Sequence, residues 1–447
     1  MASAAEQLAA NLSWSSFSKA TVLKQRIWFT LGALLIYRLS TYVPLPGINA
    51  DQLATAFQTA QQGILGVANV FSGGAIERLA IVALGIMPYI TASIIMQLMT
   101  SMVPTLEQLK KEGEAGRRTI NQYTRYGTVI LGTVQAYGVA VGLESSQGLV
   151  NDPGLFFRAT TVITLLGGTM FLMWLGEQIT ARGIGNGISL IIFAGIVAGL
   201  PGAIASTLSL GQQGALSTPL VLGILVLAVG LIAVVVFFER ALRKLLIQYP
   251  KRQVGNMMAQ GETSHLPLKL NTAGVIPPIF ASSLLLLPAT LATFAAGDSN
   301  LPGWVTTITS QLGRGQPVYY IIYGAMIAFF AFFYTALVLD PKDTANNLRN
   351  HGGFIPGIRP GERTAEHIDY VLTRITVVGA LYLVVVCLIP EFLISSAGVP
   401  FYLGGTSLLI VVSVTMDTVN QIQSHLLAQQ YEGLIKKSKL RGGKRRR

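Results

Sequence analysis

The main pattern along the chain is a series of long apolar segments separated by shorter polar stretches. The segment from Pro219 to Phe238 has no charged residue over about 20 positions, the length that an α-helix needs to cross a hydrocarbon core of ~30 Å. We predict that ten such segments form membrane-spanning helices. They lie near residues 27–43, 79–102, 126–143, 159–178, 184–205, 219–238, 273–296, 318–339, 371–390 and 401–421.

The composition supports this interpretation. Of the 447 residues, 51% are hydrophobic and only 12% are charged, whereas a soluble domain carries about 25% charged residues. The sequence therefore predicts an all-α integral membrane protein. Its single cysteine, Cys387, lies in the ninth apolar segment, which excludes an intramolecular disulfide and a metal site built on cysteines.

The positive charges predict the orientation. If the N-terminus is cytoplasmic and there are ten spans, 28 of the 32 Lys and Arg residues fall on the cytoplasmic side. Since cytoplasmic segments are enriched in Lys and Arg, we expect both termini to be cytoplasmic. The net charge of +12 is then concentrated on one face, where it favours contact with anionic phospholipids. Residues 1–26 lack the marks of a signal or transit peptide and are predicted to form an amphipathic segment on that face.

Ten spans divide into two groups of five, which we expect to be an N-terminal half at 27–212 and a C-terminal half at 213–425. An odd number per half predicts inverted repeats, although no repeat is visible letter by letter. Two cytoplasmic loops, 239–271 and 340–370, are longer than the connections usual in a compact domain, and we expect them to dock a partner. The basic tail at 426–447 is typical of a solvated, disordered segment.

No motif for enzyme chemistry stands out in the sequence. It contains no G-x-x-x-x-G-K-[ST] phosphate loop and no H-E-x-x-H, and its four histidines lie in loops or the tail. We therefore predict no catalytic residue, no metal site and no cofactor. A secondary transporter with inverted repeats is the alternative, but it would usually keep ionisable residues near the midplane, where these segments are nearly bare. A membrane enzyme would need a Ser/His or Asp pair at that depth.

Several longer motifs resemble the SecY family (SecY/Sec61-alpha), the large channel subunits of the bacterial Sec protein translocase and their relatives. They are "FSGGAIERLAIVALGIMPYITASIIMQL", "KKEGEAGRRTINQYTRYGT", "MFLMWLGEQITARGIGNGISLIIFAGIVAGLP", "HLPLKLNTAGVIPPIFASS" and "GIRPGERTAEHIDYVLTRITVVGALYL". The resemblance runs from about Lys24 to Tyr431. It implies ten helices in two inverted halves around an hourglass pore. It also implies a passive channel that conducts unfolded secretory polypeptides and releases transmembrane segments sideways.

The resemblance gives a meaning to a short apolar stretch ahead of the second span. Residues 62–76 would form a plug helix folded into the outer funnel, with a glycine pair as its hinge, because glycine gives the backbone exceptional freedom. A plain re-entrant loop or a glycine-rich turn remains the alternative. The plug and hinge residues are Phe71, Ser72, Gly73, Gly74, Glu77 and Arg78.

Matching motifs imply a ring of isoleucines at the pore constriction. Branched aliphatic side chains can surround an extended peptide while offering it no polar site. An isoleucine in a membrane helix is most often a core or lipid-facing residue, so only the motif match selects these six. They are Ile86, Ile90, Ile188, Ile192, Ile279 and Ile410.

The family's lateral gate lies where the second and third spans part from the seventh and eighth. Its polar residues match Thr91, Gln135 and Asn271. Hydrogen bonds between helices in a bilayer average only ~0.6 kcal/mol, so such a cluster can hold a gate shut and still release it. An ordinary packing role for each residue remains the alternative.

The resemblance also implies the partners. Arg359 in "PGIRPGERT" and the pair Lys251 and Arg252 would dock the SecA motor, the ribosome and its RNA, since arginine pairs with carboxylates and phosphates. Asn256 and Met257 stand where many relatives have a basic pair, which weakens the expectation for that loop tip. SecE and SecG would complete a complex that handles preproteins and signal peptides in the bacterial plasma (inner) membrane.

Overall fold

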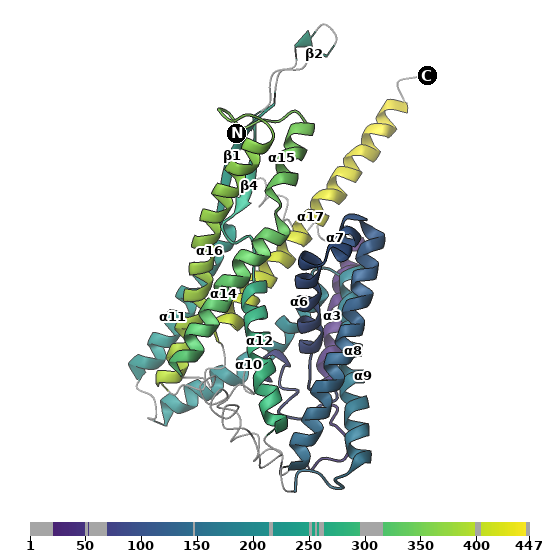
Figure 1. Ribbon diagram of the computed structural model, residues 1–447, viewed down its shortest axis with the longest axis vertical. Coiled ribbons are helices and arrows are strands. Elements are labelled where there is room, and N and C mark those ends of the chain that lie inside the picture. The colour runs from purple at the N-terminus through teal and green to yellow at the C-terminus, as the bar shows by residue number, and fades with distance from the viewer. Residues whose placement is uncertain are drawn as a thin grey trace.

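The computed structural model in Figure 1 describes residues 21–49, 52, 69–145, 148–213, 218–249, 253–254, 257–258, 263–295, 316–397 and 404–443. In this part of the chain ten helices have 16 residues or more, and each overlaps one of the ten apolar segments. They are α3 (Thr21–Ser40), α6 (Met87–Met102), α8 (Glu114–Ser145), α9 (Leu155–Arg182), α10 (Gly187–Gln212), α11 (Thr218–Arg240), α12 (Ile276–Ala295), α14 (Pro317–Val338), α16 (Glu362–Ala397) and α17 (Gly405–Gly443).

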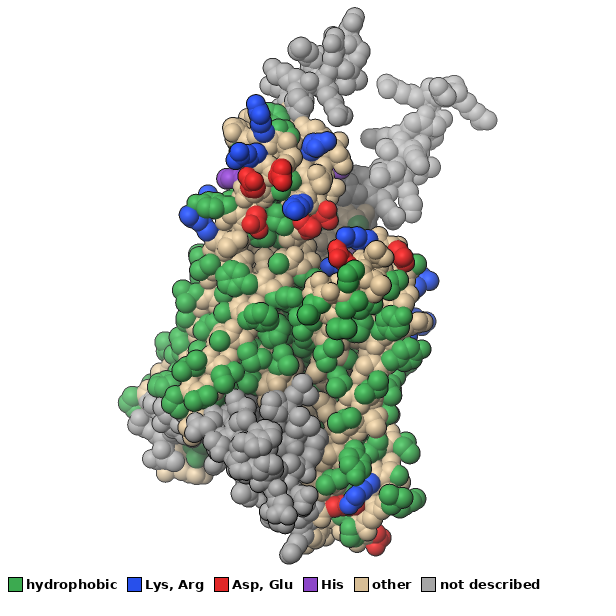
Figure 2. Space-filling model, in the orientation of Figure 1, with side chains coloured by type: hydrophobic (Ala, Val, Ile, Leu, Met, Phe, Trp, Pro, Cys, Tyr) green, Lys and Arg blue, Asp and Glu red, His purple; other side chains and the backbone are tan. Residues whose placement is uncertain are grey.

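Six of these helices are long and apolar enough to cross a membrane on their own. A seventh span is formed if α6 is taken together with the short helix α7 (Pro104–Lys111), which is bent away from it by 98°. Figure 2 shows a broad band of hydrophobic side chains across the middle of this face, with charged side chains gathered mainly at one end. This distribution is the one expected of a protein that spans a bilayer.

The helices form two groups that lie side by side. Figure 1 shows α3, α6, α8 and α9 in one group, α11, α14 and α16 in the other, and α12 between them. Helix α12 contacts α6 and α8 on one side and α14 on the other. The largest hydrophobic cluster draws buried residues from both groups, so the core lies at the junction of the two halves.

The stretch expected as a loop at 239–271 is built mainly around a β-hairpin. Strand β1 (Leu242–Gln248) pairs antiparallel with β4 (Thr263–Lys269), and the short strands β2 (Gln253–Val254) and β3 (Met257–Met258) pair with each other. Alternate residues of β1 are buried in a small separate core, which also includes residues of α15 and α16. The periodicity of 2 in "LRKLLIQ" is the sequence signal of this strand.

Two further segments are more helical than expected. Within the stretch 340–370, helix α15 (Pro341–Asn350) is preceded by its N-cap Asp340, whose side chain accepts a hydrogen bond from the Lys342 N–H at 2.8 Å. Helix α17 continues through Gly443, so most of the basic tail is helical rather than disordered. Both segments lie at the end of the molecule that carries the hairpin (Figure 1).

The second span begins as irregular backbone. The sequence predicts a helix from residue 79, but α6 begins at Met87, after Gly85 adopts a positive φ of 57°. Residues 79–81 instead pair with the chain after α3: the Leu45 N–H donates to the Leu79 carbonyl and the Ile81 N–H donates to the Val43 carbonyl, each at 2.9 Å. Such backbone is tolerated at membrane depth because it is buried in protein and has its hydrogen bonds satisfied.

Candidate functional site

The six isoleucines of the expected pore ring come from four helices of the two halves. Ile86 is the N-cap of α6 and Ile90 lies one turn further along it, while the others come from α10, α12 and α17. All six belong to the central hydrophobic cluster, five of them buried in its core and Ile188 packed against it. The structure therefore brings together residues that lie more than 300 positions apart in the sequence.

The chemistry of this cluster is that of a seal. Isoleucine side chains offer no hydrogen bond to a peptide or to water, so a ring of them disfavours a continuous water column. Their dispersion contacts are individually weak and non-directional, which suits passage of many different side chains. That these six residues form the constriction remains a prediction.

The glycine pair ends a short helical turn. Residues 69–71 are helical, the Gly73 N–H donates to the Val70 carbonyl at 3.2 Å, and the Gly74 N–H donates to the Asn69 carbonyl at 2.9 Å. These two bonds are those of a Schellman motif, with Gly73 at the position that requires a positive φ, here 67°. The glycines therefore stop the helix and turn the chain, and the earlier part of the expected plug, 62–68, lies outside the described residues.

The two charges after the glycine pair have separate partners. The Glu77 N–H donates to the Asn69 side-chain oxygen at 3.1 Å, and the Asn69 amide donates to Glu77 Oε2 at 3.4 Å. The Arg78 guanidinium lies over the Tyr42 ring, 4.3 Å from its centroid. Both side chains are exposed, so neither charge is buried away from water.

The helices of the expected gate are in contact with one another. Helix α12 packs against α6 and α8, and the Ser283 hydroxyl of α12 approaches the Met87 sulfur of α6 at 3.8 Å. Oxygen–sulfur hydrogen bonds are weak, so this contact joins the two helices without locking them. Neither residue could be singled out from the sequence, because nothing in their local pattern distinguishes them from other packing residues.

Among the described residues, no hydrogen bond joins the three expected gate residues to one another. Thr91 is buried and its hydroxyl donates to the Met87 carbonyl of its own helix at 3.1 Å. Gln135 is half-buried on α8.

Buried Asn271 donates to Glu239 Oε1 at 2.8 Å and to the Gly274 carbonyl at 3.1 Å. Asn271 is therefore tied to the end of α11. The only sequence signal that Glu239 could be this partner is its position directly after the uncharged run of α11.

Of the expected docking residues, the structure describes Arg359, which lies at the end with the hairpin. Arg359 is exposed in the turn before α16, and its carbonyl accepts a hydrogen bond from the Thr364 hydroxyl at 2.9 Å. Gln248 and Phe354 exchange two backbone hydrogen bonds, which attach the hairpin to that turn. The two extended segments thus form one surface. Lys251, Arg252 and Asn256 lie outside the described residues.

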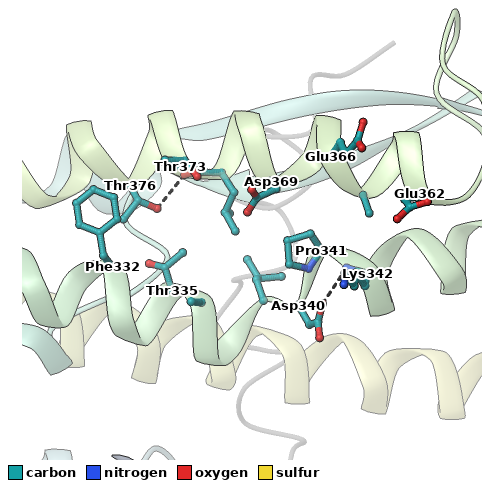
Figure 3. Close-up of a pocket in the computed structure, with 14 residues that line it drawn as sticks. Phe332, Thr335, Asp340, Pro341, Lys342, Glu362, Glu366, Asp369, Thr373 and Thr376 are labelled. Atoms are coloured by element: carbon teal, nitrogen blue, oxygen red, sulfur yellow. Dashed lines mark hydrogen bonds between the residues drawn. The ribbon is translucent and has the colours of Figure 1, made fainter. Parts of the chain in front are cut away.

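A cavity of about 590 Å³ opens between the end of α14 and the beginnings of α15 and α16. Figure 3 shows acidic side chains and one lysine toward one end of it, and Phe332, Thr335 and Thr376 toward the other. This cavity could not be predicted from the sequence, because its acidic residues come from separate stretches that meet only when the three helices pack. The charged residues are Asp340, Lys342, Glu362, Glu366 and Asp369.

Comparison with known proteins identifies the family. The SecY family model matches residues 80–419. The protein translocase subunit SecY of Pseudomonas aeruginosa is 56% identical over 419 residues, which cover 93% of this chain and 94% of the relative. The chain belongs to the SecY family. The Escherichia coli K12 SecY is 54% identical over 423 residues, covering 94% of this chain and 95% of that protein.

Solved structures of SecY-family channels share the fold. A structure described as that of a protein-conducting channel aligns with a TM-score of 0.62 over 90% of this chain and 92% of its own, at 19% identity. Sec61 in the canine ribosome–channel complex from the endoplasmic reticulum aligns with a TM-score of 0.59 at 18% identity, over 90% and 92% of the two chains. The prediction of an all-α channel fold of the SecY type is confirmed by these matches together with the SecY family model, and the ten long helices of the described residues are consistent with the predicted count.

Proposed function

We propose that this SecY-family chain is a protein-conducting channel that passes unfolded polypeptides across a membrane and releases apolar segments sideways into it. Membership of the family favours this function over a secondary transporter, because its relatives are translocase subunits along nearly their whole length. The observation that carries the proposal is the buried isoleucine cluster, contributed by helices of both halves at their junction.

The proposed sideways release of apolar segments is supported by the contacts that join α12 to α6 and α8. Helix α12 packs against α6 and α8, and the one hydrogen bond that the described residues show between α12 and α6 is the weak one to sulfur. An apolar segment gains roughly 0.3–0.6 kcal/mol per Leu or Ile placed at the bilayer centre. Summed over a segment of about 20 residues, this gain exceeds the cost of parting such contacts.

The energy for transport has to come from a partner, since the sequence has no phosphate loop for ATP. We infer that the SecA motor or a translating ribosome docks on the surface formed by the hairpin and the turn with Arg359. Lys251 and Arg252 belong to the same proposed surface, where arginines can pair with carboxylates or ribosomal RNA phosphates. SecE and SecG are the proposed companion subunits, and preproteins with signal peptides the proposed cargo.

The proposed location is the bacterial inner membrane with both termini in the cytoplasm. The support for this orientation is the charge distribution. The end with the hairpin and α15 carries most of the charged side chains in Figure 2. Anionic phospholipid headgroups would meet its lysines and arginines there.

A crosslinking experiment tests the proposed constriction. In a chain whose Cys387 is replaced by serine, Ile86→Cys places a thiol in the isoleucine cluster, and Val226→Cys places one on the exposed face of α11. A secretory precursor with its own cysteine is then stalled midway through translocation into membranes. We expect a disulfide with position 86 and none with position 226.

The opposite results are equally informative. Translocation without any link at position 86 would show that the path avoids this cluster. Failure to translocate at all, with SecA and SecE supplied and the parent Cys387→Ser chain tested in parallel, would contradict the channel function.

A further inference from the structure

The end of helix α3 contacts the backbone of the glycine hinge directly. Tyr37, which is only 1% exposed, donates its hydroxyl to the Ser72 carbonyl at 3.3 Å. The next residue, Arg38, donates from Nη1 to the Gly73 carbonyl at 2.6 Å. The second bond is charge-assisted and therefore the stronger of the two. Two adjacent side chains of one helix thus hold two adjacent carbonyls of the hinge.

Helix α10 closes the hinge from another side. A Cβ atom built on Gly73 would lie 2.9 Å from the Gly195 Cα, closer than such atoms approach in proteins. A Cβ on Gly195 would lie 3.0 Å from the Phe71 carbonyl oxygen and 3.2 Å from the Gly73 nitrogen. The two glycines therefore let the hinge backbone lie against α10, within reach of the donors on α3.

We propose that Tyr37 and Arg38 form a latch that holds the plug in its closed position, with Gly195 as the seat against which it closes. This inference rests on the proposed channel function and on the predicted plug at 62–76, which would block the resting pore. The latch binds backbone carbonyls only, so it does not depend on which side chains the plug carries. Opening requires both hydrogen bonds to be exchanged for water.

The latch has a second consequence for electrostatics at the outer mouth. Arg38 lies 5.2 Å from the centroid of the Tyr42 ring and Arg78 lies 4.3 Å from it, so two positive charges lie near one aromatic ring. Like charges close to one another repel, although water and the ring moderate the effect. Moving the hinge away from α3 relieves that repulsion, which keeps the closed state easy to release.

The test measures ion leak through resting translocase complexes in liposomes, with no precursor present. Tyr37→Phe removes one oxygen and should raise the leak about 5-fold, as expected for the loss of one neutral hydrogen bond. Arg38→Met removes the charge-assisted bond and should raise it about 10-fold or more, and Arg38→Lys should recover part of the seal. Gly195→Ala should also leak because its methyl group displaces the hinge.

Gly199→Ala is the matched control, since a Cβ at Gly199, one turn further along α10, would meet no atom within 4 Å. SecA-driven transport of a precursor in the same liposomes shows that each variant is folded and assembled. Transport with a leak equal to wild type in Tyr37→Phe and Arg38→Met would overturn the latch and leave the channel function intact. Absence of transport by the wild-type complex would overturn the proposed function, and the latch with it.

Discussion

At the end of the molecule that carries the hairpin, β1 and β4 pair over seven residues and share a small hydrophobic core with α15 and α16. At the hinge, the chain turns at two glycines and is held by side chains from other helices. The first arrangement is stabilised by many cooperative contacts, whereas the second depends on a few that can be broken singly. The contrast fits the proposed roles, since a docking surface would have to resist force and a plug would have to yield to it.

The largest effect is expected from Ile247→Ala in β1. Ile247 is 4% exposed in the hairpin core, so its truncation should destabilise the hairpin by about 2–5 kcal/mol through lost burial and the cavity left behind. Hydrogen exchange of the β1 and β4 amides measures this loss. Leu246→Ala, on the exposed side of the same strand at 40% exposure, is the control. Equal exchange in the two variants would contradict a separate core.

A smaller effect is expected from Gly73→Ala at the hinge. The positive φ of 67° costs about 1–2 kcal/mol for a residue with a Cβ, and the contact with Gly195 adds to it. Gly74 has a similar φ of 82°, but the Cβ introduced by Gly74→Ala would meet only the Arg78 side chain, at 3.8 Å. Resting ion leak should therefore be greater for Gly73→Ala. A greater leak in Gly74→Ala would show that backbone strain, and not the seat on α10, controls the closed state.

Asn271→Ala should cost about 1 kcal/mol, since it leaves Glu239 without the donor at 2.8 Å in a half-buried position. The thermal midpoint of the complex measures the change. Thr272→Ala, which removes a neighbouring hydroxyl bonded to the Lys269 carbonyl, is the control. If Asn271→Ala lowers the midpoint less when Glu239 is already alanine than it does in the parent chain, the difference is assigned to this pair.

The smallest effect is expected from Ser283→Ala. The hydroxyl–sulfur contact at 3.8 Å should contribute less than about 0.5 kcal/mol, so the variant should have nearly the parent's thermal stability. Its effect should appear instead as a modestly increased lateral release of weakly apolar segments, measured by their extraction from membranes. A loss of stability as large as that of Asn271→Ala would show that the gate is held more firmly than its contacts suggest.

Local sequence patterns were sufficient for the features that depend on neighbours along the chain. The uncharged run at 219–238 lies within α11, and the glycine pair marks the end of a helical turn. The family and the channel fold were also predicted correctly from motifs. The roles of the isoleucine ring, the gate residues and the docking residues remain predictions.

The features that the sequence could not predict depend on distant partners. Residues 79–81 are irregular because Val43 and Leu45 supply their hydrogen bonds, and an apolar run alone favours a helix there. The hairpin is fixed in part by Phe354, more than 80 residues after β4. Asn271 matches a gate motif, yet its hydrogen bond goes to α11. In each case tertiary contacts overrode the local pattern.

The irregular backbone at 79–81 has a mechanical consequence. It is bonded on both sides of fully buried Ala80 to the chain after α3, and it lies between the hinge at Gly73 and the first ring residue at Ile86. Force applied at the hinge would therefore be borne by Val43 and Leu45 before it reached α6. If the proposed plug and isoleucine ring are the two barriers of the channel, the plug could swing aside while the passing polypeptide set the width of the ring, and the two barriers would respond to separate loads.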